Sequence, residues 1–166
     1  MIRAFFFCLL LIGSQSCKVN YSFTGASIPP DVKTVSVSYF PNYAPLAQPT
    51  LSQTFTEALR DILLRQTPLS LVEGGGDLHF EGEIRNYLTS PVAVQGNETA
   101  ARNRLTITVK VRYVNTKDEN QNFEQSFSRF ADYDGGTALS EVEEDLIKEV
   151  NDQLVQDIFN RALSNW

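Results

Sequence analysis

The chain has 166 residues, a formal net charge of −6 and 42% hydrophobic residues, values that suit a single folded domain. Domains that bind nucleic acid usually carry a basic stripe, and the excess of 20 Asp and Glu over 14 Lys and Arg argues against that class. With one histidine and two cysteines, the sequence predicts no His-based metal cluster and no cofactor.

The N-terminal segment has the composition of a secretory signal. Arg3 precedes an uncharged apolar run from Ala4 to Ile12, within the roughly 7–15 residues of a signal core and shorter than the about 20 residues that span a bilayer. The small and polar residues that follow end at Cys17 and resemble the lipobox of bacterial lipoproteins, although Ser14 stands where Leu is preferred. We expect residues 1–16 to be a signal peptide and Cys17 to be the lipid-modified first residue; the alternative is a cleaved signal followed by a free cysteine.

Loss of the signal changes the composition of the mature chain. Cys8 would be discarded, so Cys17 would have no disulfide partner. Removal of Arg3 leaves 13 Lys and Arg against 20 Asp and Glu, a formal net charge of −7. Residues 17–31 contain Gly25, Pro29 and Pro30 and predict an extended tether from the lipid to one domain, residues 32–166.

The first half of this domain predicts a strand and then a helix. Residues 32–40 alternate between apolar and polar side chains, which is typical of a half-buried strand. Thr50 and Gln53 have the spacing of a capping box, and apolar residues then recur at helical spacing to about Arg65. The glycines at 74–76 lack the Lys and Ser/Thr of a phosphate loop and predict a simple connector.

Three further strands are expected, at residues 77–88, 104–114 and 123–133, separated by loops at 89–101 and 117–122. Gly82 suggests a bulge in the first of them. In the last strand, Phe123, Phe127, Phe130 and Tyr133 change parity, which suggests an irregularity near Ser128.

A long helix is expected over residues 140–163. Ser140 and Glu143 have capping-box spacing, and the acidic first turn suits the positive end of the helix dipole. The order β-α-β-β-β-α predicts an α+β two-layer sandwich, in which two helices cover one face of a four-stranded mixed sheet. The first two strands, joined through a helix, are expected to be parallel, and the last three are expected to form antiparallel hairpins.

The uncovered face of this sheet is predicted to be hydrophilic. A solvated face is tolerated by antiparallel sheets; the functional alternative is a face that fits a polar cavity such as the lumen of a wide outer-membrane barrel. The residues assigned to this face are Thr34, Ser36, Ser38, His79, Glu81, Glu83, Arg85, Thr106, Thr108, Lys110, Arg112, Glu124, Ser126 and Ser128.

The order and character of these segments resemble the lipopolysaccharide-assembly lipoprotein family LptE, especially its Bacteroidetes-type members. The resemblance covers nearly all of the mature chain and is one of pattern, without a sharp catalytic motif. It is carried by Tyr21–Gly25 after Cys17, Val35–Val37 with Phe40 and Asn42, the helix Leu51–Leu64, Gly76–Ile84, and Asn103–Ile107.

This resemblance implies an outer-membrane lipoprotein that plugs and helps to assemble the LptD barrel translocon and assists lipopolysaccharide insertion into the outer leaflet. It also implies lipopolysaccharide binding through basic residues. Within residues 102–112, a run with no acid, the candidates are Arg102, Arg104, Lys110 and Arg112, because arginine forks suit phosphate oxygens. The competing interpretation is that these cations balance acids on neighbouring strands.

Other functions receive less support. A lone strand histidine, His79, does not favour catalysis, so no enzyme is expected. A second binding function remains open, that of a periplasm-facing lipoprotein that activates a peptidoglycan synthase. Lys18-Val19-Asn20 lacks the acidic pair that marks lipoproteins for surface display, so we expect the protein to face the periplasm from the outer membrane.

Overall fold

A computed structural model describes residues 28–45, 48–92 and 101–164 of the chain. The expected signal peptide, Cys17 and most of the tether therefore lie outside the described residues. The elements are β1 (Thr34–Val37), α2 (Leu51–Gln66), β2 (Ser70–Val72), β3 (Leu78–Val92), β4 (Arg102–Asn115), a 3-10 turn (Glu119–Gln121), β5 (Phe123–Asp134) and α3 (Leu139–Leu163).

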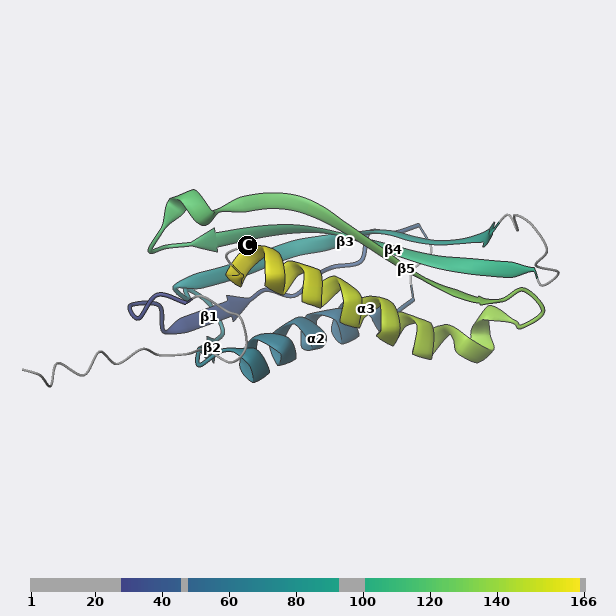
Figure 1. Ribbon diagram of the computed structural model, residues 1–166, viewed down its shortest axis with the longest axis horizontal. Helices are drawn as coiled ribbons and strands as arrows, with labels where there is room; N and C mark the ends of the chain where they lie inside the picture. The colour runs from purple at the N-terminus through teal and green to yellow at the C-terminus, as the bar shows by residue number, and fades with distance from the viewer. Residues whose placement is uncertain (1–27, 46–47, 93–100, 165–166) are drawn as a thin grey trace, which may run out of the picture.

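The domain is an α+β two-layer sandwich, as the sequence predicted. Figure 1 shows the long strands β3, β4 and β5 forming one layer, with α2 and α3 lying along the same side of it. The strand order is β2-β1-β3-β4-β5. β1 is parallel to both β2 and β3, whereas β4 is antiparallel to both β3 and β5, so the expected strand directions are confirmed.

The predicted number of strands, four, was too low by one. β2 has only three residues and is mostly exposed, so it is too short to produce a readable alternation between apolar and polar side chains. It pairs with β1 at the edge of the sheet, with Val35 opposite Leu71. The added strand extends the sheet beyond β1 and leaves the two-layer arrangement unchanged.

The core lies between the sheet and the helices. Alternate residues of β4, from Leu105 to Tyr113, are at most 1% exposed. α2 and α3 bury apolar stripes at helical spacing against this face. Burial of apolar area is the main favourable term in folding, and this shared core fixes which side of the sheet remains uncovered.

The described helices include none that is long and apolar enough to cross a membrane.

β1 is shorter than predicted because the chain after Val37 turns toward the core. Phe40 is fully buried, and its ring lies edge-on to Phe55 of α2 at a centroid distance of 5.1 Å. A Cβ at Gly82 would clash with the Lys110 carbonyl oxygen and lie 2.6 Å from the Phe40 ring, so glycine allows this close packing. The bulge expected at Gly82 was wrong. The register between β3 and β4 shifts farther along β3, between Ile84 and Asn86.

The irregularity expected near Ser128 was also wrong. β5 pairs with β4 in continuous register from Phe123 to Asp134. Phe127 and Ala131 therefore point into the core, and Phe130 lies on the opposite side and is 46% exposed. The change in parity reflects an exposed aromatic side chain, which the sequence pattern had assigned to the buried face.

Neither predicted capping box forms. Thr50 has helical backbone angles and makes no side-chain cap hydrogen bond. α3 begins at Leu139, before Ser140, and Ala138 occupies its N-cap position. Glu143 accepts hydrogen bonds from Tyr87 of β3 and from Gln48 instead. The Glu143 carboxylate, which the capping-box spacing had assigned to the start of the helix, thus makes a tertiary contact between the sheet and α3.

Candidate functional site on the outer sheet face

The outer face is the side of the sheet opposite the helices. It comprises the even-numbered side chains of β4 from Arg102 to Arg112 and their cross-strand partners on β3 and β5. All four predicted basic residues lie on it, because side chains two positions apart share one face of a strand. Of the residues predicted to line this face, Ser36 is an exception, since it is fully buried.

Arg102 and Arg104 lie at one end of the outer face. Arg104 donates two hydrogen bonds to Asp132, at 2.6 and 2.9 Å, and its guanidinium carbon lies 3.5 Å from the centre of the Phe130 ring. The hydrogen bonds with Asp132 raise the pKa of Arg104, and Arg104 lowers the pKa of Asp132. Arg102 is exposed and lies opposite Asp134 in the strand register.

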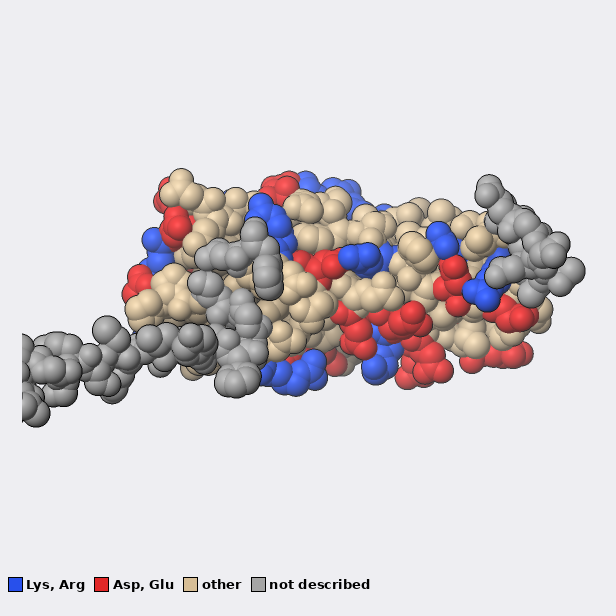
Figure 2. All heavy atoms as spheres, viewed as in Figure 1, with Lys and Arg blue, Asp and Glu red and all other residues tan. Residues whose placement is uncertain are grey.

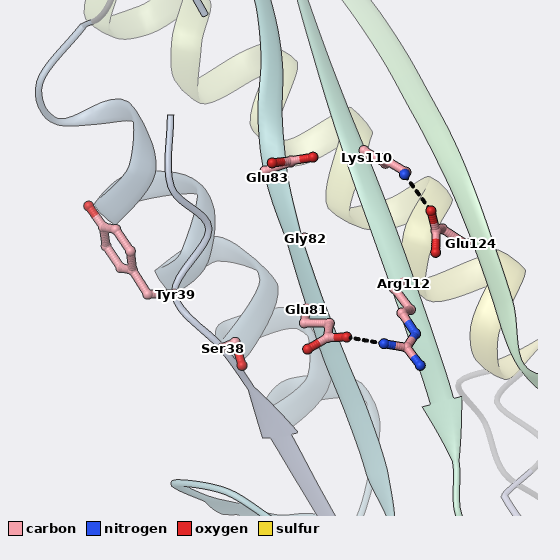
Figure 3. A pocket seen from close by; sticks show the side chains of 8 residues that line it. All are labelled: Ser38, Tyr39, Glu81, Gly82, Glu83, Lys110, Arg112 and Glu124. Carbon is pink, nitrogen blue, oxygen red and sulfur yellow. Dashed lines mark hydrogen bonds and ion pairs between the residues drawn. The ribbon is translucent and has the colours of Figure 1, made fainter. Parts of the chain in front are cut away.

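Lys110 and Arg112 lie at the other end, beside a hollow of about 360 Å³. Figure 3 shows this hollow over Gly82, with Arg112 directed toward Glu81 and Lys110 toward Glu124. The Arg112–Glu81 ion pair measures 2.9 Å, and Lys110 forms an ion pair with Glu124. The contact with Lys110 lowers the pKa of Glu124. The remaining lining residues are Ser38, Tyr39 and Glu83.

The four basic residues do not form one cluster. Arg104 and Lys110 are six residues apart on one strand, a separation of about 20 Å at about 3.3 Å per residue. Thr106 and Thr108 lie between them, and the Thr108 hydroxyl is 2.9 Å from that of Ser128. Two basic pairs therefore lie at opposite ends of the strand, and acids on β3 or β5 face them. Each pair offers exposed guanidinium or ammonium hydrogens in a surface whose charges are nearly balanced.

Sequence reasoning missed an apolar strip in the middle of the outer face. Leu88 and Phe130 are opposite Thr106 on β3 and β5, and they are 48% and 46% exposed. Phe130 is three residues from Phe127, an odd spacing that places the two side chains on opposite faces of a regular strand. The sequence alone did not show that β5 is regular, and the strand register does. The strip adjoins Arg104, so an exposed apolar contact and a cation lie next to each other.

His79 is held by neighbouring side chains. Its Nδ1 atom lies 2.7 Å from the Ser36 hydroxyl, and its Nε2 atom lies 3.5 Å from a Glu81 carboxylate oxygen. The order of these groups is like that of a Ser-His-acid set, but a fully buried Ser36 hydroxyl could not reach a substrate. The set therefore links β1 to β3. The described residues include no group of three or more His, Cys, Asp or Glu side chains that could hold a metal ion.

Comparison with known protein families identifies the domain. Residues 32–162 match the family model LptE, described as lipopolysaccharide-assembly. The chain belongs to the LptE family. The match runs from before β1 almost to the end of α3, so it covers every strand of the sheet. Membership of LptE supports a role in lipopolysaccharide assembly.

Two solved structures with TM-scores of at least 0.50 share the fold of this LptE-family chain. A minor lipoprotein from Acinetobacter baumannii is 16% identical with a TM-score of 0.50, covering 78% of this chain and 91% of that chain. A putative neuraminyllactose-binding hemagglutinin homolog from Helicobacter pylori is 11% identical with a TM-score of 0.51, covering 83% and 87%. The rare lipoprotein B from Shewanella oneidensis is 18% identical with a TM-score of 0.48, covering 77% and 92%. No curated protein matches the sequence.

Proposed function

We propose that this LptE-family protein is an outer-membrane lipoprotein that plugs and helps to assemble an LptD-like barrel and assists lipopolysaccharide insertion into the outer leaflet. The observation that carries the proposal is the family match over residues 32–162. The geometry of the outer face agrees with it. A wide outer-membrane barrel has a polar interior, and an elongated sheet whose exposed face is charge-balanced and polar outside the strip of Leu88 and Phe130 suits such a cavity.

The partner can be identified by purification. A tagged full chain is expressed in cells, the outer membranes are solubilised in detergent, and the co-purified proteins are analysed by mass spectrometry. We expect a large outer-membrane barrel in stoichiometric amount. Recovery of a penicillin-binding protein would support the alternative role, activation of a peptidoglycan synthase. Recovery of neither protein would contradict both functions.

The anchor is the second part of the proposal. Cys17, which lies outside the described residues, would carry the lipid that keeps the domain beside its membrane partner. One acyl chain anchors a protein only marginally, whereas a diacylglycerol with a third acyl chain would hold it stably. Globomycin should cause the uncleaved precursor to accumulate, and Cys17→Ala should release the protein from the membrane fraction. Retention of Cys17→Ala on the membrane would contradict this anchor.

The third part is lipopolysaccharide binding by the basic residues of β4. Because Arg104 already faces Asp132, a glutamate there would add repulsion, so Arg102→Gln with Arg104→Gln tests the site more cleanly. We expect this double variant to bind purified lipopolysaccharide at least several-fold more weakly while retaining its circular dichroism spectrum. Lys110→Gln with Arg112→Gln is the matched pair at the other end of the strand. Unchanged affinity in either pair would remove that pair from the site.

A further inference from the structure

A groove lies between α2 and α3 on the side of the domain away from the outer face. It has a volume of about 530 Å³. Its buried residues are Ile147, 5% exposed, and Asn151, 2% exposed. The exposed acids of α3 that line the groove are Glu144, Asp145 and Asp152. The full lining is Gln48, Thr50, Thr54, Ala58, Glu144, Asp145, Ile147, Lys148, Asn151 and Asp152, and we call it the acidic groove.

The acids of this groove are unevenly neutralised. Lys148 forms an ion pair with Asp152 at 3.0 Å. Within the described part of the chain, no ion pair engages Glu144 or Asp145. The helix dipole favours acids at an N-terminus, but the effect falls off within the first turn, and both residues lie beyond the first turn of α3. Figure 2 shows acidic side chains gathered over the region that α3 covers.

Asn151 adds an independent requirement for a hydrogen-bond donor. Its Nδ2 atom donates to the Thr54 hydroxyl oxygen at 3.4 Å, and that hydroxyl donates its own hydrogen to the Leu51 carbonyl oxygen at 3.1 Å. With its hydrogen directed to Leu51, the Thr54 oxygen accepts from the Asn151 amide. The Asn151 Oδ1 atom is buried and has no donor among the described residues. Buried polar atoms are normally satisfied, so this acceptor calls for an N–H or O–H group in the groove.

We propose that the acidic groove receives an arginine side chain from a basic segment of a partner polypeptide. The guanidinium would donate to Asn151 Oδ1, because its N–H donors suit such an acceptor, and the carboxylates of Glu144 and Asp145 farther along the groove would attract its charge. Ala58 is partly exposed and offers apolar surface to the methylene stem, because arginine packs its stem along such surface. The proposal does not depend on the identity of the barrel partner.

The test uses the purified full chain in non-ionic detergent and a dye-labelled, end-blocked tri-arginine peptide as the probe. A tri-citrulline peptide, which has the same shape without the charge, is the neutral control. Fluorescence anisotropy measures the affinity of each peptide. We expect tri-arginine to bind, its affinity to fall with added salt, and tri-citrulline to bind at least tenfold more weakly.

Three variants locate the site. Glu144→Gln with Asp145→Asn should weaken tri-arginine binding at least fivefold. Glu73→Gln with Glu119→Gln removes the same charge from two exposed acids outside the groove and should change the affinity less than twofold. Asn151→Leu should weaken binding without lowering the melting temperature, since it removes a buried acceptor that lacks a donor.

Two results would overturn the proposal. Equal losses in the groove pair and the control pair would show attraction to the net charge of the protein alone. Unchanged binding in the Asn151→Leu variant, together with unchanged binding in the groove pair, would place the peptide elsewhere. The barrel purification described above is a separate experiment, so failure of the groove leaves the proposed function open, and the reverse also holds.

Discussion

The outer face of the sheet and the surface of α3 are both exposed and charged, but they differ in how many of their charged side chains form ion pairs. On the sheet, Arg104, Lys110 and Arg112 each form an ion pair with an acid on a neighbouring strand. On α3, Lys148 is the only base between Glu141 and Asp152, and Glu144 and Asp145 are left without a basic partner among the described residues. Cross-strand register places opposite charges together, whereas one helix cannot neutralise its own excess.

This difference assigns the negative net charge mainly to the helix layer. An anionic ligand therefore meets less repulsion on the outer face, and a cationic partner is attracted most strongly to α3. The Debye length is about 8 Å at physiological ionic strength, and exposed charges on opposite sides of the two-layer domain are farther apart than that, since packed sheets alone are spaced by about 10 Å. The two faces can therefore act as separate binding surfaces, and the predictions below test how far they differ.

The largest difference between the two sides of the sheet should appear when the same residue type is removed from each. Phe159 of α3 is 1% exposed and Phe130 of β5 is 46% exposed. Phe159→Ala should lower the free energy of unfolding by about 3–5 kcal/mol. Phe130→Ala should lower it by about 0.5–1 kcal/mol, mainly through loss of the Arg104 cation–π contact. Urea denaturation measures both, and similar losses would mean that Phe130 contributes to the core.

Much of this architecture follows from the sequence. The strict alternation from Leu105 to Tyr113 and the helical spacing of apolar residues in α2 and α3 predict the long strand, the two helices and the covered face. Local patterns of this kind depend only on side chains that repeat with the period of one element, so the fold class did not require knowledge of distant contacts.

What the sequence could not predict depends on pairing between distant segments. The bidentate Arg104–Asp132 contact joins residues 28 positions apart, and it exists because β4 and β5 align in one register. The Tyr87–Glu143 hydrogen bond displaces a locally plausible capping box in the same way. The four basic residues could be placed on one face by their even spacing, but their acidic partners could not be identified.

The hydrogen bond from Tyr87 to Glu143 should give the next largest effect, because it joins the inner face of the sheet to α3. Tyr87→Phe removes a hydrogen bond to a charged group, and Glu143 then keeps only Gln48. The free energy of unfolding should fall by about 1.5 kcal/mol. A thermal or urea melt at neutral pH measures the loss, and an unchanged value would mean that water replaces the hydroxyl without penalty.

The same residue predicts the alkaline limit of stability. Burial and the contact with Glu143 raise the pKa of Tyr87 above its ordinary value of 10.0, and burial raises the pKa of Tyr113 to about 12. Both residues keep their protons in the folded state after the unfolded chain has lost them. Stability should therefore be complete below pH 10 and decline above it. Tyr87→Phe should make this decline shallower, and the part due to Tyr113 should persist.

Acid should act at the end of the sheet where β1 and β3 begin. Asp77 accepts hydrogen bonds from the Lys33 amide at 2.9 Å and from the Thr34 amide at 3.0 Å, and it forms an ion pair with Lys117 at 3.1 Å. These contacts lower the pKa of Asp77 below its ordinary value of 3.8. The stability they provide is present above pH 3.8 and is lost as the pH falls through the lower folded value. Asp77→Asn should flatten the acid limb of a stability–pH profile; an unchanged limb would contradict this assignment.

The smallest effect on stability should come from the ion pairs of the outer face. Arg112 and Glu81 form an exposed pair at 2.9 Å, and pairs of this kind contribute about 0.2–1 kcal/mol. Arg112→Gln should lower the free energy of unfolding by no more than that amount, and Glu81→Gln in addition should cause little further loss, because the interaction has already been removed. A double-mutant cycle in urea gives the coupling energy of the pair. A coupling above this range would mean that the charged network also rigidifies the sheet, whereas a small value leaves Arg112 available to exchange Glu81 for a ligand.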